Sequence, residues 1–387
     1  MNSLELLRYR KKLIQDALEF RKGDRIPHLS NFVFWPIHHY GYKLTEACRN
    51  WDIMETIQRR FMEEFPFDQV RPLSGTLCNP PAMLDGIGEG FNIFDDEAGA
   101  VSIRDFRLLE AEEYEAFLED KNRCEWERLL PRKFPAWNSL KVKDLISPIE
   151  EFIKFSAHSQ KMTDVAREEF GIPQICSMLG GMPGVEQMFC VYVGMKGMSL
   201  DLRRRKETVK QICDMLEQNT DQVIRQIEAD DPNEEKSAFT IMISILSQVF
   251  LNPKQWDEFY WPRLKKLLDA VCRSGKTAYI FVEGKIDRFY SYFKDFPAGH
   301  IAMHLEQDDI MEARRQLPDL CLVGGMPSSV LASAQPDECI QYAKKLIEEL
   351  GTGGGYIISQ DKMMSYYRDA KPENVKAVCN YLQEFYW

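Results

Sequence analysis

Near the start of its C-terminal third the sequence reads Ala278-Tyr279-Ile280-Phe281-Val282, five apolar residues in a row. Apolar side chains on consecutive positions suit a strand that is buried on both faces, as in a parallel sheet with helices on one face and a barrel core on the other. Similar β-rich runs recur in this part of the chain, and a helical stretch separates each from the next. They span Thr277 to Glu283, His300 to Glu306, Leu320 to Met326 and Gly355 to Ser359. This alternation predicts βα units.

The helices around these strands are amphipathic. The clearest runs from Asp337 to Leu350 and is followed by glycines from Gly351 that end it, and the last helix is expected to start near Pro372. The residues from Phe239 to Phe250 are apolar throughout, which fits a strand that leads into a helix and equally a buried helix. Upstream strand candidates are Arg25 to Phe34, Asp68 to Leu73 and Pro173 to Leu179. The sequence therefore predicts one α/β domain over residues 1–387, a (β/α)8 TIM-type barrel.

Residues 105–161 interrupt the βα alternation. This segment is strongly charged and has a helical pattern. We interpret it as a helical insertion over the mouth of the barrel, where it could act as a lid.

Composition and charge limit the kinds of molecule that the protein is expected to bind. A chain of 387 residues with 44% hydrophobic side chains can bury a large core, and a net charge of -11 argues against general affinity for nucleic acid or anionic membrane. The ten cysteines form no CxxC pair, so most are expected to be buried apolar groups in a reducing cytoplasm. Met1 to Phe20 reads as a basic amphipathic helix rather than a signal peptide, and no apolar stretch approaches the roughly 20 residues that span a bilayer. We therefore expect a cytoplasmic protein with a small ligand or a protein partner.

Three short motifs resemble the uroporphyrinogen decarboxylase superfamily. They are Gly353-Gly354-Gly355-Tyr356-Ile357-Ile358-Ser359, then Lys371-Pro372-Glu373-Asn374-Val375 before the closing helix, and Gly23-Asp24-Arg25-Ile26-Pro27 near the start. Together they span nearly the whole chain. The superfamily includes decarboxylases and also methyltransferases that exchange methyl groups with a corrinoid protein. The residues of the site are therefore needed to distinguish these two activities.

The segment after the first strand argues against a porphyrinogen decarboxylase. Such an enzyme holds a polyanionic substrate with an arginine-rich segment at this place, whereas the stretch from His28 to Gly41 contains no arginine. Aromatic residues stand there instead, which indicates a pocket for a neutral or aromatic ligand. Trp35, His39 and Tyr40 are our candidates for its wall, and Asn31 could hydrogen-bond a phenol substituent. The alternative is that this aromatic cluster packs beneath the insertion.

The same resemblance points to a metal site. Corrinoid-linked members that methylate thiols hold Zn²⁺ with His-x-Cys at one strand end and a distant Cys, but here Glu283 replaces the first cysteine and Asp361 stands near the place of the last. His304 and Glu306 lie two residues apart on the next strand, so they share a face, and Glu283 would join them at the C-terminal mouth. Glu283, His304 and Glu306 could thus form a nitrogen and oxygen site for Zn²⁺. A further upstream carboxylate ligand has no counterpart here, since Asp269 stands in that region.

Methyltransferases of anaerobic O-demethylase systems are similar in using Glu and His in place of Cys. The resemblance implies a methyltransferase I that moves a methyl group from an aryl methyl ether to the cob(I)alamin of a separate corrinoid protein, with Zn²⁺ as the Lewis acid on the departing oxygen. Cobalamin would come in trans, because the chain lacks the D-x-H-x-x-G pattern of a cobalamin-binding module.

Other interpretations stay open at this point. The donor or acceptor could be methanol, a methylamine, a halomethane or a thiol, the transfer could run in reverse, and the chain could be a decarboxylase or a non-catalytic protein that binds an aromatic ligand. Glu283 could instead pair with Lys285, His304 could be a hydrogen-bonded core histidine, and Glu306 could orient His304. Asp308 and Asp309 are expected to cap the next helix.

Overall fold

A parallel sheet forms the centre of the protein. The computed structural model describes residues 1–71, 73, 81–88, 92–104, 106–217, 220–229 and 234–386. Six strands follow one another in chain order, β3-β4-β5-β6-β7-β8, and all pair in parallel. They are Gln174–Leu179 (β3), Ser237–Ile245 (β4), Ala278–Val282 (β5), Ile301–Leu305 (β6), Cys321–Met326 (β7) and Tyr356–Gln360 (β8). Consecutive parallel neighbours are the arrangement that successive βα units produce.

Two short segments near the N-terminus extend the sheet beyond β8. His28 pairs in parallel with Ile358 of β8, and Leu29 pairs in parallel with Gln69. The backbone N–H of Leu29 donates to the Ile358 carbonyl over 3.0 Å. These segments bring the number of parallel strands to eight and confirm the predicted TIM-type barrel.

The first two strands are much shorter than expected from Arg25 to Phe34 and from Asp68 to Leu73. The first segment makes bridges at His28, Leu29 and Phe32, and the described part of the second makes one at Gln69. The backbone N–H of Asn31 donates to the side chain of Gln360 over 2.8 Å rather than to a neighbouring strand, and Trp35 already begins a helix. Side-chain bonding thus interrupts the first strand after Leu29, and Phe32 then pairs with Met364 beyond β8.

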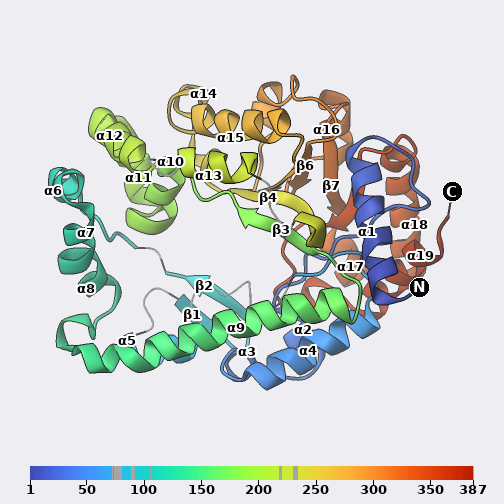
Figure 1. Cartoon of the computed structure of the whole chain (residues 1–387), viewed down its shortest axis with the longest axis horizontal. Coiled ribbons are helices and arrows are strands. Elements are labelled where there is room, and N and C mark those ends of the chain that lie inside the picture. Colours follow the sequence, from blue (N-terminus) through green and yellow to red (C-terminus); the bar gives the residue numbers. More distant parts are fainter. Residues whose placement is uncertain are drawn as a thin grey trace.

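Helices surround the sheet (Figure 1). None of the described helices is both long and apolar enough to cross a membrane. The longest, α9, runs along one side of the molecule past α2, α3 and α4 (Figure 1). The helices are α1 (Ser3–Leu18), α2 (Trp35–His39), α3 (Leu44–Ala47), α4 (Trp51–Glu64), α5 (Pro81–Ile87), α6 (Tyr114–Glu119), α7 (Lys121–Cys124), α8 (Leu130–Lys133), α9 (Ile146–Glu168), α10 (Gly184–Gln187), α11 (Met195–Arg204), α12 (Lys206–Leu216), α13 (Thr220–Glu228), α14 (Pro253–Gln255), α15 (Trp261–Arg273), α16 (Ile310–Gln316), α17 (Ser328–Ser333), α18 (Pro336–Leu346) and α19 (Pro372–Glu384).

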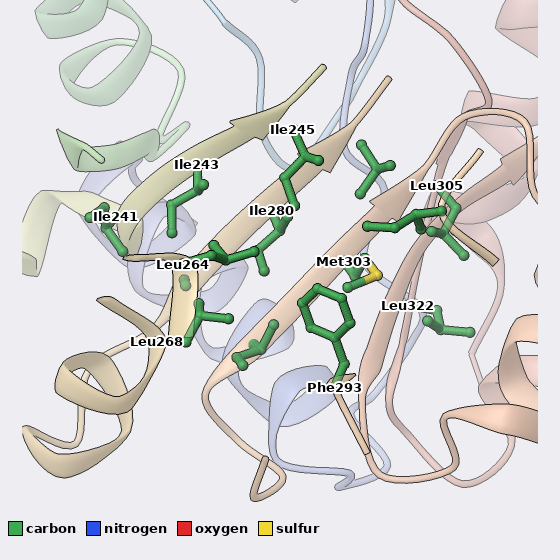
Figure 2. Close-up of a cluster of buried hydrophobic side chains, with 14 of the residues drawn as sticks. Ile241, Ile243, Ile245, Leu264, Leu268, Ile280, Phe293, Met303, Leu305 and Leu322 are labelled. Atoms are coloured by element: carbon green, nitrogen blue, oxygen red, sulfur yellow. The ribbon is translucent and has the colours of Figure 1, made fainter. Parts of the chain in front are cut away.

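The outer face of the sheet carries the main core. Figure 2 shows Ile241, Ile243 and Ile245 of β4 beside Ile280 of β5, with Leu264 and Leu268 of α15 packed against them. Every second residue of a strand points to the same face, so these positions face the helices while the residues between them face the barrel interior. This alternation decides which polar side chains can reach a ligand inside the barrel.

Helix α1 closes one end of the barrel. Its side chains Ile14, Ala17 and Leu18 are buried in an interior cluster with Leu29, Phe239, Tyr279, Phe281, Ala302, Cys321, Val323 and Ile357. The carbonyl of Ala17 accepts from the N–H of Gly355, which directly precedes β8. The closed end is therefore the end where the strands begin, and the opposite, carboxyl end is left as the mouth.

Two local expectations are decided by the structure. The stretch from Phe239 to Phe250 is a strand that leads into a helical turn, β4 followed by the 3-10 helix η8 (Ser247–Phe250), so it is not a buried helix. Asp309 caps α16, because its side chain accepts from the backbone N–H groups of Met311 and Glu312 at 2.9 and 3.2 Å.

The predicted insertion consists of helices in its described part. An antiparallel hairpin, β1 (Asn92–Asp95) and β2 (Ala100–Ile103), precedes it, and α6, α7, α8 and the start of α9 fill it. It packs on the helices that follow β3, since the hydroxyl of Tyr114 donates to Asp201 over 2.6 Å and that of Tyr192 donates to Glu125 over 2.7 Å. Helix α9 continues to Glu168, so the helical region extends beyond the expected boundary. Movement as a lid stays a prediction.

Candidate active site at the barrel mouth

His304 of β6 lies inside the barrel and both of its ring nitrogens are hydrogen-bonded. Its exposed fraction is 0%, Nδ1 is 2.6 Å from the Tyr279 hydroxyl, and Nε2 is 2.8 Å from the Gln360 carbonyl oxygen. A carbonyl can only accept, so Nε2 carries the proton and Nδ1 accepts from the tyrosine. Burial lowers the pKa of His304 to about 3, which keeps the ring neutral.

Glycine at position 324 makes room for this histidine. Its φ of +116° lies in a region that side chains avoid, and a Cβ there would sit 3.3 Å from Cδ2 of His304 and 3.1 Å from the Leu305 carbonyl oxygen. The glycine at position 324 of β7 is therefore explained by close packing against His304, whereas Gly325 packs against Tyr356 and Leu346.

Two carboxylates stand at the mouth. Glu283 follows β5 and Glu306 follows β6, and Glu306 accepts from the backbone N–H of Gly284 over 2.7 Å. The side chain of Glu283 is exposed at the tip of its strand. Two effects raise its pKa: the larger is desolvation by the surrounding protein, and the smaller is the negative charge of Glu306. In the described ranges no ion pair joins Glu283 to Lys285. Glu306 is fixed by a backbone hydrogen bond, whereas the carboxyl group of Glu283 remains accessible to a ligand.

The three predicted zinc ligands do not form a metal centre in this structure. Among the described residues, no group of three or more His, Cys, Asp or Glu side chains is placed to hold a metal ion. The reason is that His304 lies below the two glutamates with both nitrogens engaged, while Glu306 is bonded to Gly284. Glu283 and Glu306 therefore lie close together at the strand ends, whereas the ring of His304 is held by Tyr279 and Gln360.

The other carboxylates considered for the metal have structural partners. Asp361 accepts from the backbone N–H groups of Ser328 and Lys362 at 3.0 and 2.8 Å, which places it at the start of α17. Asp269 lies on α15 and pairs with Lys265 over 2.7 Å. Asp361 thus stands where β8 ends but is engaged by backbone N–H groups, and Asp269 is engaged on its helix.

The residues of the predicted aromatic wall form a packed cluster. Trp35 is 1% exposed, its indole N–H donates to the Ala370 carbonyl over 3.0 Å, and its ring stacks on His39. His39 and Tyr40 both bond to Glu64 of α4, at 3.1 and 3.0 Å. These contacts hold α2 against α4, which agrees with the alternative that the aromatic cluster is packing. The role of Trp35, His39 and Tyr40 as a pocket wall stays a prediction.

Asn31 is the one predicted substrate-binding residue that the structure directs into the barrel. Its neighbour Phe32 packs outward on Phe61 of α4, so Asn31 points to the opposite face, and it is 2% exposed. Its side-chain nitrogen has no partner among the described residues. A donor of this kind inside a barrel is available to a ligand.

Three interior residues were not singled out from the sequence. Tyr279 and Gln360 hold His304, and Arg71 lies beside the Tyr279 ring, 6.0 Å from its centre. A signal for Arg71 was present, because the expected strand from Asp68 to Leu73 alternates Gln69, Val70 and Arg71. Such alternation places Gln69 and Arg71 on one face, opposite the apolar Val70.

We expect replacement of His304 by alanine to lower the free energy of unfolding by about 2 to 3 kcal/mol. The change leaves the Tyr279 hydroxyl and the Gln360 carbonyl without partners and opens a cavity. A urea unfolding curve measures it. His300→Ala is the matched control, since His300 is half-buried with one hydrogen bond of 2.8 Å to the Lys276 carbonyl, and a smaller loss is expected there. Equal losses in the two variants would contradict the buried arrangement of His304.

Comparison with known proteins agrees with this architecture. A barrel with its polar groups where the strands end falls in the class of TIM barrels, whose active sites lie at that face. The profile of the uroporphyrinogen decarboxylase (URO-D) family matches residues 150–385, and the chain belongs to this family. A solved methyltransferase from Methanosarcina mazei has the same fold, with a TM-score of 0.63 and 16% sequence identity over 97% of this chain and 98% of that chain. The sequence matches no curated protein.

Proposed function

We propose that this protein transfers a methyl group from an aryl methyl ether to the cob(I)alamin of a separate corrinoid protein. The observation that carries the proposal is the accessible acid Glu283 beside Glu306 at the mouth of a URO-D family barrel. A fold shared along nearly the full length with a methyltransferase supports the same choice within the family. The corrinoid, when its protein docks, supplies the nucleophile that takes the methyl group.

The remaining chemistry falls to this chain. When the bond between the methyl carbon and the ether oxygen breaks, its electron pair stays on the oxygen, which is a poor leaving group unless it is neutralised. Burial and the charge of Glu306 raise the pKa of Glu283, which favours this carboxyl group as the donor of a proton to that oxygen. The product is a phenol, and water returns a proton to Glu283. Glu306 raises the pKa of Glu283 through its charge and is anchored by the Gly284 N–H.

Decarboxylation of a porphyrinogen is disfavoured by the first strand. Arg25, the arginine nearest to that strand, is 2% exposed and is bound to Asp68 through two hydrogen bonds of 2.7 and 2.6 Å. The segment from His28 to Gly41 supplies no other arginine. A substrate with many carboxylates would therefore find no cluster of cations there.

The test is a spectroscopic assay. The protein is mixed with cob(I)alamin and separately with a methoxylated benzene, methanol, a methylamine and a methyl thioether, and formation of methylcobalamin is followed with analysis of the second product. Methylcobalamin and a phenol from the aryl ether alone are expected. Carbon dioxide from uroporphyrinogen, or binding of the ether without turnover, would contradict the proposal.

Zinc, which the resemblance implies, is not used in this scheme because the donor set is not formed. We expect the purified protein to hold less than one zinc per chain and to keep its methyl-transfer rate after treatment with a chelator. Elemental analysis and the assay above measure this. One zinc per chain in the unaltered protein, lost in Glu283→Gln, would show that Glu283 is a ligand and would overturn its role as the acid.

A further inference from the structure

We propose that the barrel interior holds a carboxylate-binding site centred on Arg71, so that the ligand is an aromatic acid. Its identity as the methyl donor rests on the proposed function, whereas the binding site does not. Three features support the site: an arginine with no counter-ion in the described part of the chain, buried polar groups that likewise lack partners there, and the position of both relative to Glu283.

Arg71 faces the barrel interior. Asp68 binds Arg25, and Val70 lies in the outer core, so Gln69 and Arg71 point the other way. The pairing of Gln69 with the interior residue Leu29 agrees with this orientation. The guanidinium of Arg71 thus enters the space that the strands enclose.

The contacts of the Arg71 guanidinium are with uncharged groups. It lies 6.0 and 5.8 Å from the ring centres of Tyr279 and Phe281, and Nη2 is 3.7 Å from the sulfur of Met242. No carboxylate within the described ranges pairs with it, in contrast to Arg10 and Arg25, which share Asp68. Arg71 is half-buried, and a guanidinium that is partly withdrawn from water among aromatic rings is stabilised by an accompanying anion. A bound carboxylate would supply that anion.

Tyr279 leaves most of the Arg71 donors available. The Tyr279 hydroxyl gives its proton to His304, whose other nitrogen donates to Gln360, so the tyrosine oxygen can accept from Arg71. A guanidinium has five N–H donors in a planar fork, and one bond to Tyr279 leaves an edge that fits the two oxygens of a carboxylate. The chain of hydrogen bonds fixes Tyr279 and thereby the direction of that edge.

Buried polar groups without partners line the same face. Gln69 is 1% exposed and both ends of its amide lack a partner among the described residues, as do the side-chain nitrogen of Asn31 and the hydroxyl of Ser359, which is 0% exposed. Ser359 shares a face with the interior residue Ile357, two positions before it. Buried polar atoms are nearly always satisfied, so several together indicate a site completed by a ligand.

The distance to the mouth suits an aromatic ring. The Arg71 guanidinium lies 5.8 Å from the ring centre of Phe281, and Glu283 follows β5 two residues after Phe281, a rise of about 7 Å. A benzene ring with a carboxylate at one end and a methoxy group at the other has a comparable span. The acid group would reach Arg71 while the ether oxygen reaches Glu283.

Calorimetric titration of the full chain tests the site without any corrinoid. The probes are 3-methoxybenzoate and 4-methoxybenzoate, with 4-methoxybenzamide as the neutral analogue. We expect at least one benzoate to bind about 10-fold or more tightly than the amide, and Arg71→Gln to weaken benzoate binding by about 10- to 100-fold while amide binding is unchanged. Arg71→Lys, which keeps the charge but not the fork, should give an intermediate loss. Arg273→Gln is the matched control, because Arg273 is exposed at the end of α15, where it pairs with Glu228.

The outcomes separate the two proposals. Equal binding of benzoate and amide, or unchanged benzoate binding in both Arg71 variants, would overturn the carboxylate site. If Arg71→Gln unfolds, the Arg71→Lys titration still decides, since a carboxylate site requires its affinity for benzoate to fall. Selective benzoate binding without methyl transfer would keep the site and overturn the proposed function, whereas methyl transfer from neutral and acidic ethers at equal efficiency would do the reverse.

Discussion

Replacement of Glu283 by glutamine should lower kcat for methyl transfer from an aryl ether by about 10²- to 10³-fold, because the variant lacks the acid that protonates the departing oxygen. Glutamine has nearly the same shape and can still hydrogen-bond the ether oxygen, but it has no proton to give. The ground-state complex loses little, so KM should change by less than about threefold, because the missing interaction belongs to the transition state. Initial rates of methylcobalamin formation measure both constants.

Two further variants control this result. Glu349→Gln removes an exposed carboxylate just before β8, at the end of the barrel opposite the mouth, and should leave kcat unchanged. Glu306→Gln keeps an oxygen for the Gly284 N–H but removes the like charge that raises the pKa of Glu283. The pKa of Glu283 should then fall, and the loss of activity at high pH should begin at a lower pH. An unchanged pH profile in this variant would contradict the coupling of the two carboxylates.

Replacement of Asp68 by alanine lowers the free energy of unfolding by about 3 to 5 kcal/mol. Asp68 is 0% exposed, binds Arg25 twice, accepts from the His28 N–H over 2.8 Å and lies 3.5 Å from Arg10 of α1. Its removal leaves the buried guanidinium groups of Arg10 and Arg25 without this counter-ion. It also removes the contact that joins α1 to the first two strands. Chemical unfolding at neutral pH measures the loss. The exposed pair between Lys265 and Asp269 offers a control, where Asp269→Ala should cost no more than about 0.5 kcal/mol.

The Asp68 contribution has a defined pH dependence. Burial alone would raise the pKa of this carboxyl, but the charge and hydrogen bonds of Arg25 outweigh burial and lower it. A group whose folded pKa is depressed stabilises the protein above its unfolded pKa, about 3.9 for aspartate, and this contribution disappears as the pH falls through the folded value. Stability curves of the unaltered chain and Asp68→Ala should therefore converge below about pH 4. Parallel curves down to pH 2 would contradict the ion-pair explanation.

The sequence predicted the barrel because its signal is local. Consecutive apolar residues such as Ala278 to Val282 define strands that are buried on both faces, and the glycines and Pro372 mark where helices end and begin. The first two strands were harder to delimit, because Asn31 gives its backbone N–H to the side chain of Gln360, more than 300 residues away. No local pattern encodes such a bond.

The site was predictable only in part for the same reason. Strand ends placed Glu283 and Glu306 at the mouth, since that follows from the parallel order of the strands. Whether His304 points a nitrogen at them depends on Tyr279 and Gln360, which come from two other strands. The aromatic residues of α2 left two interpretations open, because composition cannot tell a pocket wall from the packing of Trp35 and His39 against α4. Each of these cases depends on tertiary contacts.

The most direct test of Glu283 as the acid compares two donors with different leaving groups. A nitro-substituted methoxybenzoate leaves as a stable phenolate that needs no proton, whereas the unsubstituted methoxybenzoate does need one. We predict that Glu283→Gln transfers methyl from the nitro compound at nearly the unaltered rate and loses about 10²-fold or more on the unsubstituted one. Equal losses on both donors, or none on either, would contradict the claim that Glu283 protonates the departing oxygen.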